Sequence, residues 1–318
     1  MTLELGKPNQ DVFAKTLLEL AQQDKDILVM TSDSRGSGKL VPFGEALPDQ
    51  LIEVGIAEQN LIGISAGLAS TGKKVFAVSP ACFLTARALE QIKNDVAYSD
   101  NPVRIVGISA GVSYGALGST HHSLHDFAAL RAINNIDIIV PADNFETREA
   151  VKALIEHPHP VYLRLGKKAM PLLHPPETRF EIGKAITVRE GYDVTIIAIG
   201  ETVAPAAIAA DLLQTQGISA RVISMHTLRP FDTDALLDAA RATHGIITVE
   251  EHSVHGGLGE CCAAILMQNQ LAVPFKIVGI PDEYTITGSQ VEIFNHYGIS
   301  AEGLAATARQ LLQIEVRS

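Results

Sequence analysis

The sequence contains no tryptophan, and aromatic residues make up only 5% of its 318 residues. Its hydrophobic cores must therefore be built mostly from leucine, isoleucine, valine and alanine. Hydrophobic residues still amount to 47% of the chain and charged residues to 19%, a composition that excludes a disordered protein. At about 100–200 residues per domain, this length predicts two domains.

Basic residues are also scarce, with 25 lysines and arginines against 36 acidic residues and a formal net charge of −11. This balance argues against nucleic acid as a partner, because nucleic-acid binders neutralise phosphates with lysine and arginine. The sequence has no apolar run of about 18 residues and no signal-peptide pattern at its start, so we expect no membrane association. Its three cysteines form no disulfide framework. We therefore expect a cytoplasmic protein.

Short β-branched runs alternate with longer helical patterns along most of the chain. Continuous apolar strands with helices between them predict parallel sheets that are covered by helices. Residues 166–180 interrupt the alternation with three prolines and no periodicity, as an interdomain linker would. We predict an α/β protein of two domains, each a mostly parallel sheet flanked by helices: residues 1–170, a linker at 171–182, and residues 183–318.

The predicted strands are residues 27–30, 51–54, 74–78, 103–108, 136–140, 161–165, 193–199, 220–225, 245–249 and 275–280. The predicted helices are one that Asn9 caps and residues 58–70, 83–97, 126–133, 145–155, 202–216, 257–269 and 301–312.

The first candidate for chemistry is Glu58, in the segment VGIAEQN that joins a predicted strand to a predicted helix. Ligands of open α/β sheets bind outside the carboxyl ends of the strands, which is where this residue lies. An acid in a first helical turn can also serve only to complement the helix dipole. The helix that follows is apolar on nearly all sides and is expected to be buried, which disfavours a Glu58 that is merely solvated.

The second candidate is the segment GSTHHSLHD (residues 118–126), which contains three histidines after a predicted strand. These histidines could bind a polar substrate or act as acids and bases. Zinc is disfavoured, because the spacing of His121 and His125 is not accompanied by a convincing set of carboxylate or thiolate ligands. In a third segment, EEHSVHGGLGE (residues 250–260), glycines before a helix could approach a phosphate, but the dinucleotide spacing is incomplete. A tight strand-to-helix turn is favoured there.

Taken in order, these segments resemble the C-terminal half of a transketolase over nearly the whole chain. The resemblance rests on IEVGIAEQNLIGISAGLA, ACFLTARALEQIKNDVAYSDNPVRIVG, GSTHHSLHDFAALRAI, IIVPADNFETREAV and PVYLRLGKK, and on TIIAIGETVAPAAIAA and ARVISMHTLRPFD after the linker. It implies a thiamine diphosphate enzyme in which a pyrimidine-binding domain is followed by a C-terminal domain.

Three residues match cofactor-binding positions of that family. Glu58 matches the catalytic glutamate, which hydrogen-bonds N1′ of the aminopyrimidine and so promotes removal of the thiazolium C2 proton. Phe83 matches an aromatic residue that packs against the pyrimidine. Asp33 matches an acidic residue near the cofactor at the dimer interface.

Three further residues match substrate-binding positions. His121 matches a catalytic histidine that contacts the donor ketose and the bound two-carbon unit. Ser37 and Lys167 align with a serine and an arginine that bind the substrate phosphate. Lysine can supply the charge at that position, although it cannot form a bidentate guanidinium contact.

The sequence also departs from the family at substrate positions. Residues 115–118 read GALG where the family often has Gly-Glu-Asp-Gly, and Ser109 replaces a phosphate-binding histidine. Pro80 and Ala86 replace aromatic residues of some members. A buried side chain that hydrogen-bonds a sugar hydroxyl discriminates strongly between substrates, so its loss should change which sugars are accepted. These departures indicate a non-standard donor sugar such as apulose 4-phosphate.

The family holds the diphosphate through a metal bound by a GDG motif, and this chain contains no GDG. The resemblance therefore implies a partner subunit that corresponds to a transketolase N-terminal half, in an α2β2 heterotetramer. Mg²⁺ (or Ca²⁺) would be bound mainly by that partner. The alternatives are a 2-oxoacid dehydrogenase beta chain, a deoxyxylulose-phosphate synthase-like enzyme, or a non-catalytic regulatory subunit.

Overall fold

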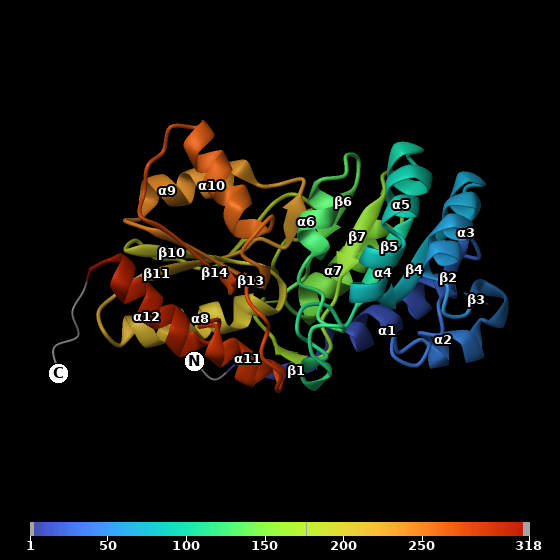
Figure 1. The fold of residues 1–318 in the computed structure, drawn as a ribbon, viewed down its shortest axis with the longest axis horizontal. Coiled ribbons are helices and arrows are strands. Elements are labelled where there is room, and N and C mark those ends of the chain that lie inside the picture. Colours follow the sequence, from blue (N-terminus) through green and yellow to red (C-terminus); the bar gives the residue numbers. More distant parts are fainter. Residues whose placement is uncertain (1–2, 176, 314–318) are drawn as a thin grey trace.

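The computed structural model describes residues 3–175 and 177–313. The chain forms two α/β units side by side, with the N-terminal half at the right of Figure 1 and most of the C-terminal half at the left. The predicted fold class, mostly parallel sheets flanked by helices, is confirmed. The ends of the predicted domains, residues 1–2 and 314–318, and Pro176 of the predicted linker lie outside the described residues.

The first sheet has seven strands in the order β12-β6-β7-β5-β4-β2-β3. Its members are β2 (Ile27–Thr31), β3 (Leu51–Glu53), β4 (Lys74–Pro80), β5 (Arg104–Ile108), β6 (Asp137–Ile139), β7 (Val161–Arg164) and β12 (Thr227–Arg229). All neighbours are parallel except β12, which pairs antiparallel with β6. The strands β2 and β5 are buried at every position, as expected for strands covered on both faces.

Helices cover both faces of this sheet. They are α1 (Asn9–Ala21), α2 (Val41–Ala46), α3 (Glu58–Ser70), α4 (Ala81–Arg87), α5 (Leu89–Gln91), the π-helix η2 (Ile92–Tyr98), α6 (Asp126–Arg131) and α7 (Asn144–Leu154), with short 3-10 turns η1 (Pro48–Gln50) and η3 (Gly115–Leu117). Apolar residues of α1, α2 and α7 form one core against the sheet. Residues of α3, α4, η2 and α6 form the other.

The predicted helix at 83–97 differs from the structure. The chain leaves α4 at Ala88, whose φ of −102° and ψ of 19° are not helical, and continues as α5 and η2. The wider turns of η2 still direct Ile92, Val96 and Ala97 into the core. The apolar spacing thus predicted the buried face correctly but could not reveal the change of helix type.

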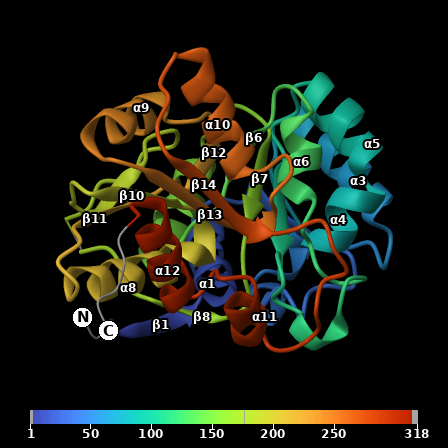
Figure 2. The same cartoon turned by 60° about the vertical axis from the view of Figure 1, so that its left-hand side comes forward.

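The second sheet has the order β14-β13-β10-β11-β9 and is parallel except for β9. Its strands are β9 (Ile186–Arg189), β10 (Val194–Ala198), β11 (Ala220–Ser224), β13 (Ile246–Ser253) and β14 (Phe275–Ile280). Its helices are η4 (Gly200–Thr202), α8 (Val203–Gln214), α9 (Thr233–Ala242), α10 (Leu258–Gln268), α11 (Gln290–His296) and α12 (Ala301–Leu311). In Figure 2, α9 and α10 lie on one face and α8 and α12 on the other.

The connection between the two units is firmly anchored. Strand β8 (Ala169–Pro171) pairs antiparallel with β1 (Leu5–Pro8). Beyond it, His174 lies 3.1 Å from Asp143 and 3.2 Å from Glu146, which are buried at the start of α7. The ring of Phe180 stacks on His226, with centroids 4.4 Å apart. The predicted domain boundaries remain a prediction, and β12 shows that the two sheets do not divide the chain at a single point.

Among the described residues, no helix combines the length and the apolar character that crossing a membrane would require.

Candidate functional site

The candidate residues lie at the carboxyl edge of the first sheet. Glu58 begins α3 after β3, and Phe83 lies in α4 after β4. His121 is in the long loop after β5, and Lys167 follows β7. Because the carboxyl ends of parallel strands share one edge, residues that are distant in the sequence meet there.

Glu58 is buried, with only 5% of its side chain exposed. Its carboxylate Oε1 accepts a hydrogen bond of 2.8 Å from Nη1 of Arg87, a residue that is 48% exposed. The guanidinium of Arg87 also lies over the Phe83 ring, 4.3 Å from its centroid. Arg87 therefore joins the predicted acid to the predicted aromatic residue.

The contacts continue from Phe83 to the phosphate-binding candidate. The rings of Phe83 and His121 meet edge to face, with centroids 5.3 Å apart. Tyr114 also meets this histidine edge to face, with centroids 5.5 Å apart, and Nζ of Lys167 lies 5.1 Å from the Tyr114 ring centroid. We call this series the ring row. Its members are Glu58, Arg87, Phe83, His121, Tyr114 and Lys167.

Arg87 and Tyr114 were not predicted from the sequence. Arg87 follows Phe83 by four residues on α4, a spacing that places two side chains on one helix face. This spacing could have indicated Arg87 from the sequence. Tyr114 lies in an irregular glycine-rich loop, where spacing carries no such information. Burial raises the pKa of the Tyr114 hydroxyl, so this group is neutral at physiological pH.

Asp33 and Ser37 lie elsewhere on the same edge, in the loop after β2. Asp33 is exposed and has a left-handed φ of 54°, and its amide donates to Oε1 of Glu53 on the neighbouring strand β3 (2.7 Å). The Ser37 hydroxyl donates to the carbonyl of Ser34 (3.1 Å). The contacts found for the described residues do not join these two residues to the ring row. All six predicted site roles remain predictions.

The three histidines of the loop have different surroundings. Nδ1 of His121 lies 2.9 Å from the Thr120 hydroxyl. His122 is buried and donates from Nε2 to the carbonyl of Gly115 (2.9 Å), and burial lowers the pKa of this histidine. Nε2 of His125 lies 3.5 Å from the Thr85 hydroxyl. Within residues 3–175 and 177–313, no group of three or more His, Cys, Asp or Glu side chains is arranged to hold a metal ion.

A second polar assembly is buried between the two units, and we call it the interdomain cluster. Nε of Arg164, at the end of β7, donates to Oδ2 of Asp126 (2.8 Å), and its Nη1 lies 3.7 Å from Oε2 of Glu251. Nε2 of Gln290 donates both to Glu251 Oε1 (2.8 Å) and to Glu201 Oε2 (2.6 Å). These five residues define the cluster, which the sequence-based prediction did not include.

The cluster holds three carboxyl groups and a guanidinium. Burial, together with the neighbouring Glu251, raises the pKa of Glu201 to about 8. Burial also raises the pKa of Glu251. Burial acts in the same direction on Asp126, but the charge of Arg164, the nearby His252 and the hydrogen bonds from Arg164 and Tyr162 together outweigh it and hold the pKa of Asp126 below its ordinary value. With a pKa of about 8, Glu201 carries a proton at neutral pH.

The glycine-rich segment after β13 forms a strand-to-helix turn, as favoured from the sequence. The carboxylate of Glu250 accepts hydrogen bonds from the amides of Leu258 (2.7 Å) and Gly259 (2.9 Å) at the start of α10. Glu260 accepts a further one from the Gly256 amide (2.8 Å). The amides that could have met a phosphate are thus bound by the chain's own acids.

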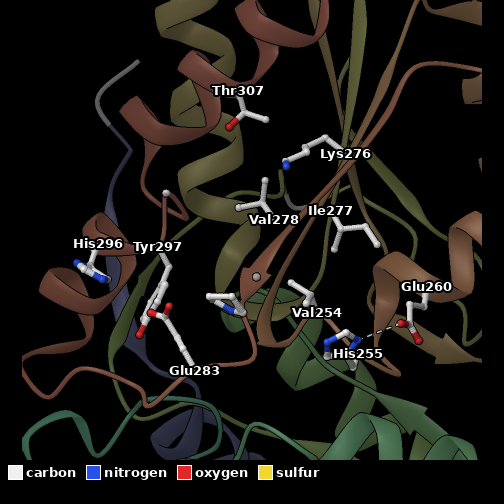
Figure 3. Close-up of a pocket in the computed structure, with 13 residues that line it drawn as sticks. Val254, His255, Glu260, Lys276, Ile277, Val278, Glu283, His296, Tyr297 and Thr307 are labelled. Atoms are coloured by element: carbon white, nitrogen blue, oxygen red, sulfur yellow. Dashed lines mark hydrogen bonds and ion pairs between the residues drawn. The ribbon is translucent and has the colours of Figure 1, made fainter.

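A separate open pocket of about 690 Å³ lies in the second unit, beside β14 and the residues that follow β13 (Figure 3). Lys276, Glu283, Tyr297 and the pair His255–Glu260 line it. It contains none of the ring row residues, so it is distinct from the candidate site.

Comparison with known proteins decides the family. Residues 7–171 match the transketolase pyrimidine-binding domain, and residues 183–304 match the transketolase C-terminal domain. The chain belongs to the transketolase family. The predicted resemblance is confirmed.

Relatives of nearly the same length show which part of a transketolase this chain is. It is 51% identical over 302 residues to an apulose-4-phosphate transketolase subunit of Phocaeicola vulgatus, with 95% of this chain and 96% of that protein covered. It is 35% identical to a 6-deoxy-6-sulfo-D-fructose transketolase subunit of a Clostridium species, with 96% and 94% covered.

A solved structure agrees. A split gene transketolase, described as an inactive beta4 tetramer, is 37% identical to this chain and superimposes with a TM-score of 0.87 over 97% of this chain and 99% of that one. The chain is therefore the C-terminal-half subunit of a split transketolase, as predicted from the sequence.

Proposed function

We propose that the ring row forms the cofactor-facing and substrate-facing side of a two-subunit transketolase, which transfers a two-carbon ketol unit from a ketose phosphate to an aldose phosphate. The observation that carries this proposal is the continuous contact from Glu58 through Phe83 and His121 to Lys167. It sets an acid, a flat ring, an imidazole and a cation in the order in which a pyrimidine, a sugar and a phosphate would follow one another.

The residues present fit the pyrimidine end of thiamine diphosphate. A carboxyl group with only 5% of its side chain exposed can hold a proton at a ring nitrogen, and the half-buried Phe83 ring can pack against a flat heterocycle. When bound, the cofactor supplies the centre that stabilises carbanion character during ketol transfer. Glu58 would hold and return the proton at N1′, and Phe83 would fix the plane of the ring.

The remaining candidates would act on the sugar phosphate. His121 would hydrogen-bond the donor ketose through whichever ring nitrogen faces the site, and it is oriented by Thr120, Phe83 and Tyr114. Lys167 would attract the phosphate as a single charge, with Ser37 as a further phosphate contact. Asp33 would lie near the cofactor, where the partner subunit approaches.

A partner subunit would hold the diphosphate end. Oxygen ligands for Mg²⁺ must surround the ion, and the described residues offer no such group. The sequence also lacks a GDG motif. These features support an N-terminal-half partner that binds Mg²⁺ (or Ca²⁺) and forms an α2β2 heterotetramer with this chain. Three free cysteines fit the reducing cytoplasm that we expect as its location.

Apulose 4-phosphate is the donor that we propose. A relative with 51% identity carries that substrate in its name, and residues 115–118, beside His121, lack the acidic side chain that reads a sugar hydroxyl in many members. A site without that reader suits a donor without the corresponding hydroxyl stereocentre.

The test is to produce this chain with its N-terminal-half partner and to assay ketol transfer with thiamine diphosphate and magnesium. We expect turnover of apulose 4-phosphate at a higher kcat/KM than xylulose 5-phosphate. If the complex used only the pair xylulose 5-phosphate and ribose 5-phosphate, and not apulose 4-phosphate, the substrate assignment would be wrong. Full activity of this chain without a partner would overturn the two-subunit arrangement.

A further inference from the structure

The loop that carries His121 is fixed at both ends by strand β13 of the second unit. Near its start, the Val112 amide donates to Oε1 of Glu251 (3.0 Å). Near its end, the Ser253 amide donates to the carbonyl of Leu124 (3.1 Å). Two nearby positions of one strand therefore hold a loop that belongs to the other sheet.

The approach of this loop to the second unit is close enough to require glycine. At Gly111, where φ is +60°, a Cβ would collide with the carboxylate of Glu251. At Gly115, where φ is +47°, it would collide with the carbonyl of Gly288. Both positions combine a left-handed backbone with packing that leaves no room for a side chain.

Glu251 is itself held in place by the interdomain cluster. Arg164 donates from Nη2 to the carbonyl of Glu251 (2.8 Å) and also to the carbonyl of Ser123 in the loop (3.3 Å). Gln290 donates to the same carboxylate oxygen that the Val112 amide uses. The Glu251 side chain is buried, its Oε1 accepts two hydrogen bonds and its Oε2 faces the Arg164 guanidinium, so its position is well defined.

A short path leads from this carboxylate to the candidate substrate residue. Val112 is two residues before Tyr114, and the Tyr114 ring packs against His121. A shift of the Val112 amide would therefore move the ring that orients the imidazole. Hydrogen bonds weaken steeply as their distance and angle depart from the preferred values, so a displaced imidazole should bind the donor sugar less tightly.

We propose that Glu251 is a positioning residue for substrate binding, which sets the place of His121 through the Val112 amide. This inference rests on the proposed role of His121 in contacting the donor sugar. It gives the second unit a function in the enzyme: its strand β13 sets the shape of a substrate loop that the first unit carries.

The adjacent residue Glu250 provides a matched control. It lies on the same strand, is equally buried, and likewise accepts hydrogen bonds from backbone amides. Its amides belong to α10 rather than to the loop. Loss of either carboxylate should therefore reduce stability, whereas only loss of Glu251 should disturb His121.

The experiment compares Glu251→Ala, Glu251→Gln and Glu250→Ala in the reconstituted complex. We expect Glu251→Ala to raise the donor KM about tenfold while kcat changes by less than about threefold. Glu251→Gln retains an oxygen for the Val112 amide, so it should recover most of this loss. Glu250→Ala should leave KM unchanged, and equal KM values in the two alanine variants would overturn the proposal.

Hydrogen exchange provides a readout that does not depend on activity. In the full chain, exchange at residues 111–124 should accelerate in Glu251→Ala and stay unchanged in Glu250→Ala. Where Glu251→Ala fails to fold, Gln290→Leu removes one partner of the carboxylate and should produce the same effects at a smaller size. Unchanged exchange in the folded variants overturns the proposal. A different result would separate the two proposals. If the wild-type complex transfers no ketol unit but exchange still accelerates in Glu251→Ala, then Glu251 does hold the loop and the proposed function is wrong.

Discussion

The ring row and the interdomain cluster both gather charged residues from distant segments, but they differ in how far they are enclosed. In the ring row, Arg87 is 48% exposed and Lys167 is exposed. In the interdomain cluster, each of the five members is buried. Several of the contacts in the ring row are ring packings, whereas the cluster is joined mainly by hydrogen bonds and ion pairs.

This difference in burial predicts that the two groups of residues serve different purposes, one in ligand binding and one in stability. Exposed groups that are held by ring contacts can turn toward a ligand at little cost, because solvent screens their charges. Buried charges depend on their partners, and removal of one leaves the others uncompensated. Changes in the ring row should therefore act mainly on activity, and changes in the interdomain cluster mainly on stability.

The largest effect is expected at Glu58. Glu58→Gln keeps the shape of the side chain but cannot hold the proton, so kcat of the reconstituted complex should fall by roughly 10³-fold or more. Steady-state kinetics with the donor ketose phosphate measure it, and the thermal midpoint should change little. Glu90→Gln, an exposed carboxylate on α5, is the control. Activity within tenfold of the wild type would favour a non-catalytic subunit.

The second effect concerns stability. Arg164→Met removes the guanidinium between Asp126 and Glu251 and leaves both carboxyl groups buried without it. The free energy of unfolding should fall by about 3–5 kcal/mol, as measured by urea denaturation. Arg148→Met breaks only a surface pair with Glu149, so its loss should stay below about 1 kcal/mol. Equal losses in the two variants would contradict the comparison.

The smallest effect is a pH dependence at Glu201. The folded pKa of about 8 lies above the ordinary value of 4.5, so the folded state keeps a proton that the unfolded state releases. This group therefore reduces stability progressively as pH rises from about 4.5 to 8. Glu201→Gln stays neutral, so the difference between its thermal midpoint and that of the wild type should be smallest near pH 5 and should grow as pH rises.

Above pH 8, the Glu201→Gln variant should unfold at a clearly higher temperature than the wild type, because the folded wild type then has to ionise a buried carboxyl group. Thermal unfolding between pH 5 and pH 9 measures this difference. Glu302→Gln, an exposed acid on α12, is the control: its thermal midpoint should differ from that of the wild type by the same amount at every pH. If the difference for Glu201→Gln were also independent of pH, the pKa of Glu201 in the folded protein would be close to its ordinary value.

The fold could be predicted because its strands are nearly continuous apolar runs, such as residues 194–198 (VTIIA), which are buried at every position. Glu58 and the histidine segment of His121 could be singled out as candidates because each follows a strand of one parallel sheet. Phe83 was a candidate only through the family resemblance, and the roles of all three remain predictions. The interdomain cluster could not be predicted, because Asp126, Arg164 and Glu251 meet only when two sheets pack together. The periodicity of a sequence predicts which face of a helix or strand is buried, but it does not predict which residues of two different sheets come into contact.

The position of strand β12 determines where the chain can be divided into fragments. Residues 227–229, which follow three strands of the second sheet in sequence, complete the edge of the first sheet beside β6. A fragment that ends at the linker would leave the backbone amides and carbonyls of β6 open at that edge, where another copy could pair with them. The two units are thus best handled as one piece, since a cut between them would convert a covered strand into a site for aggregation.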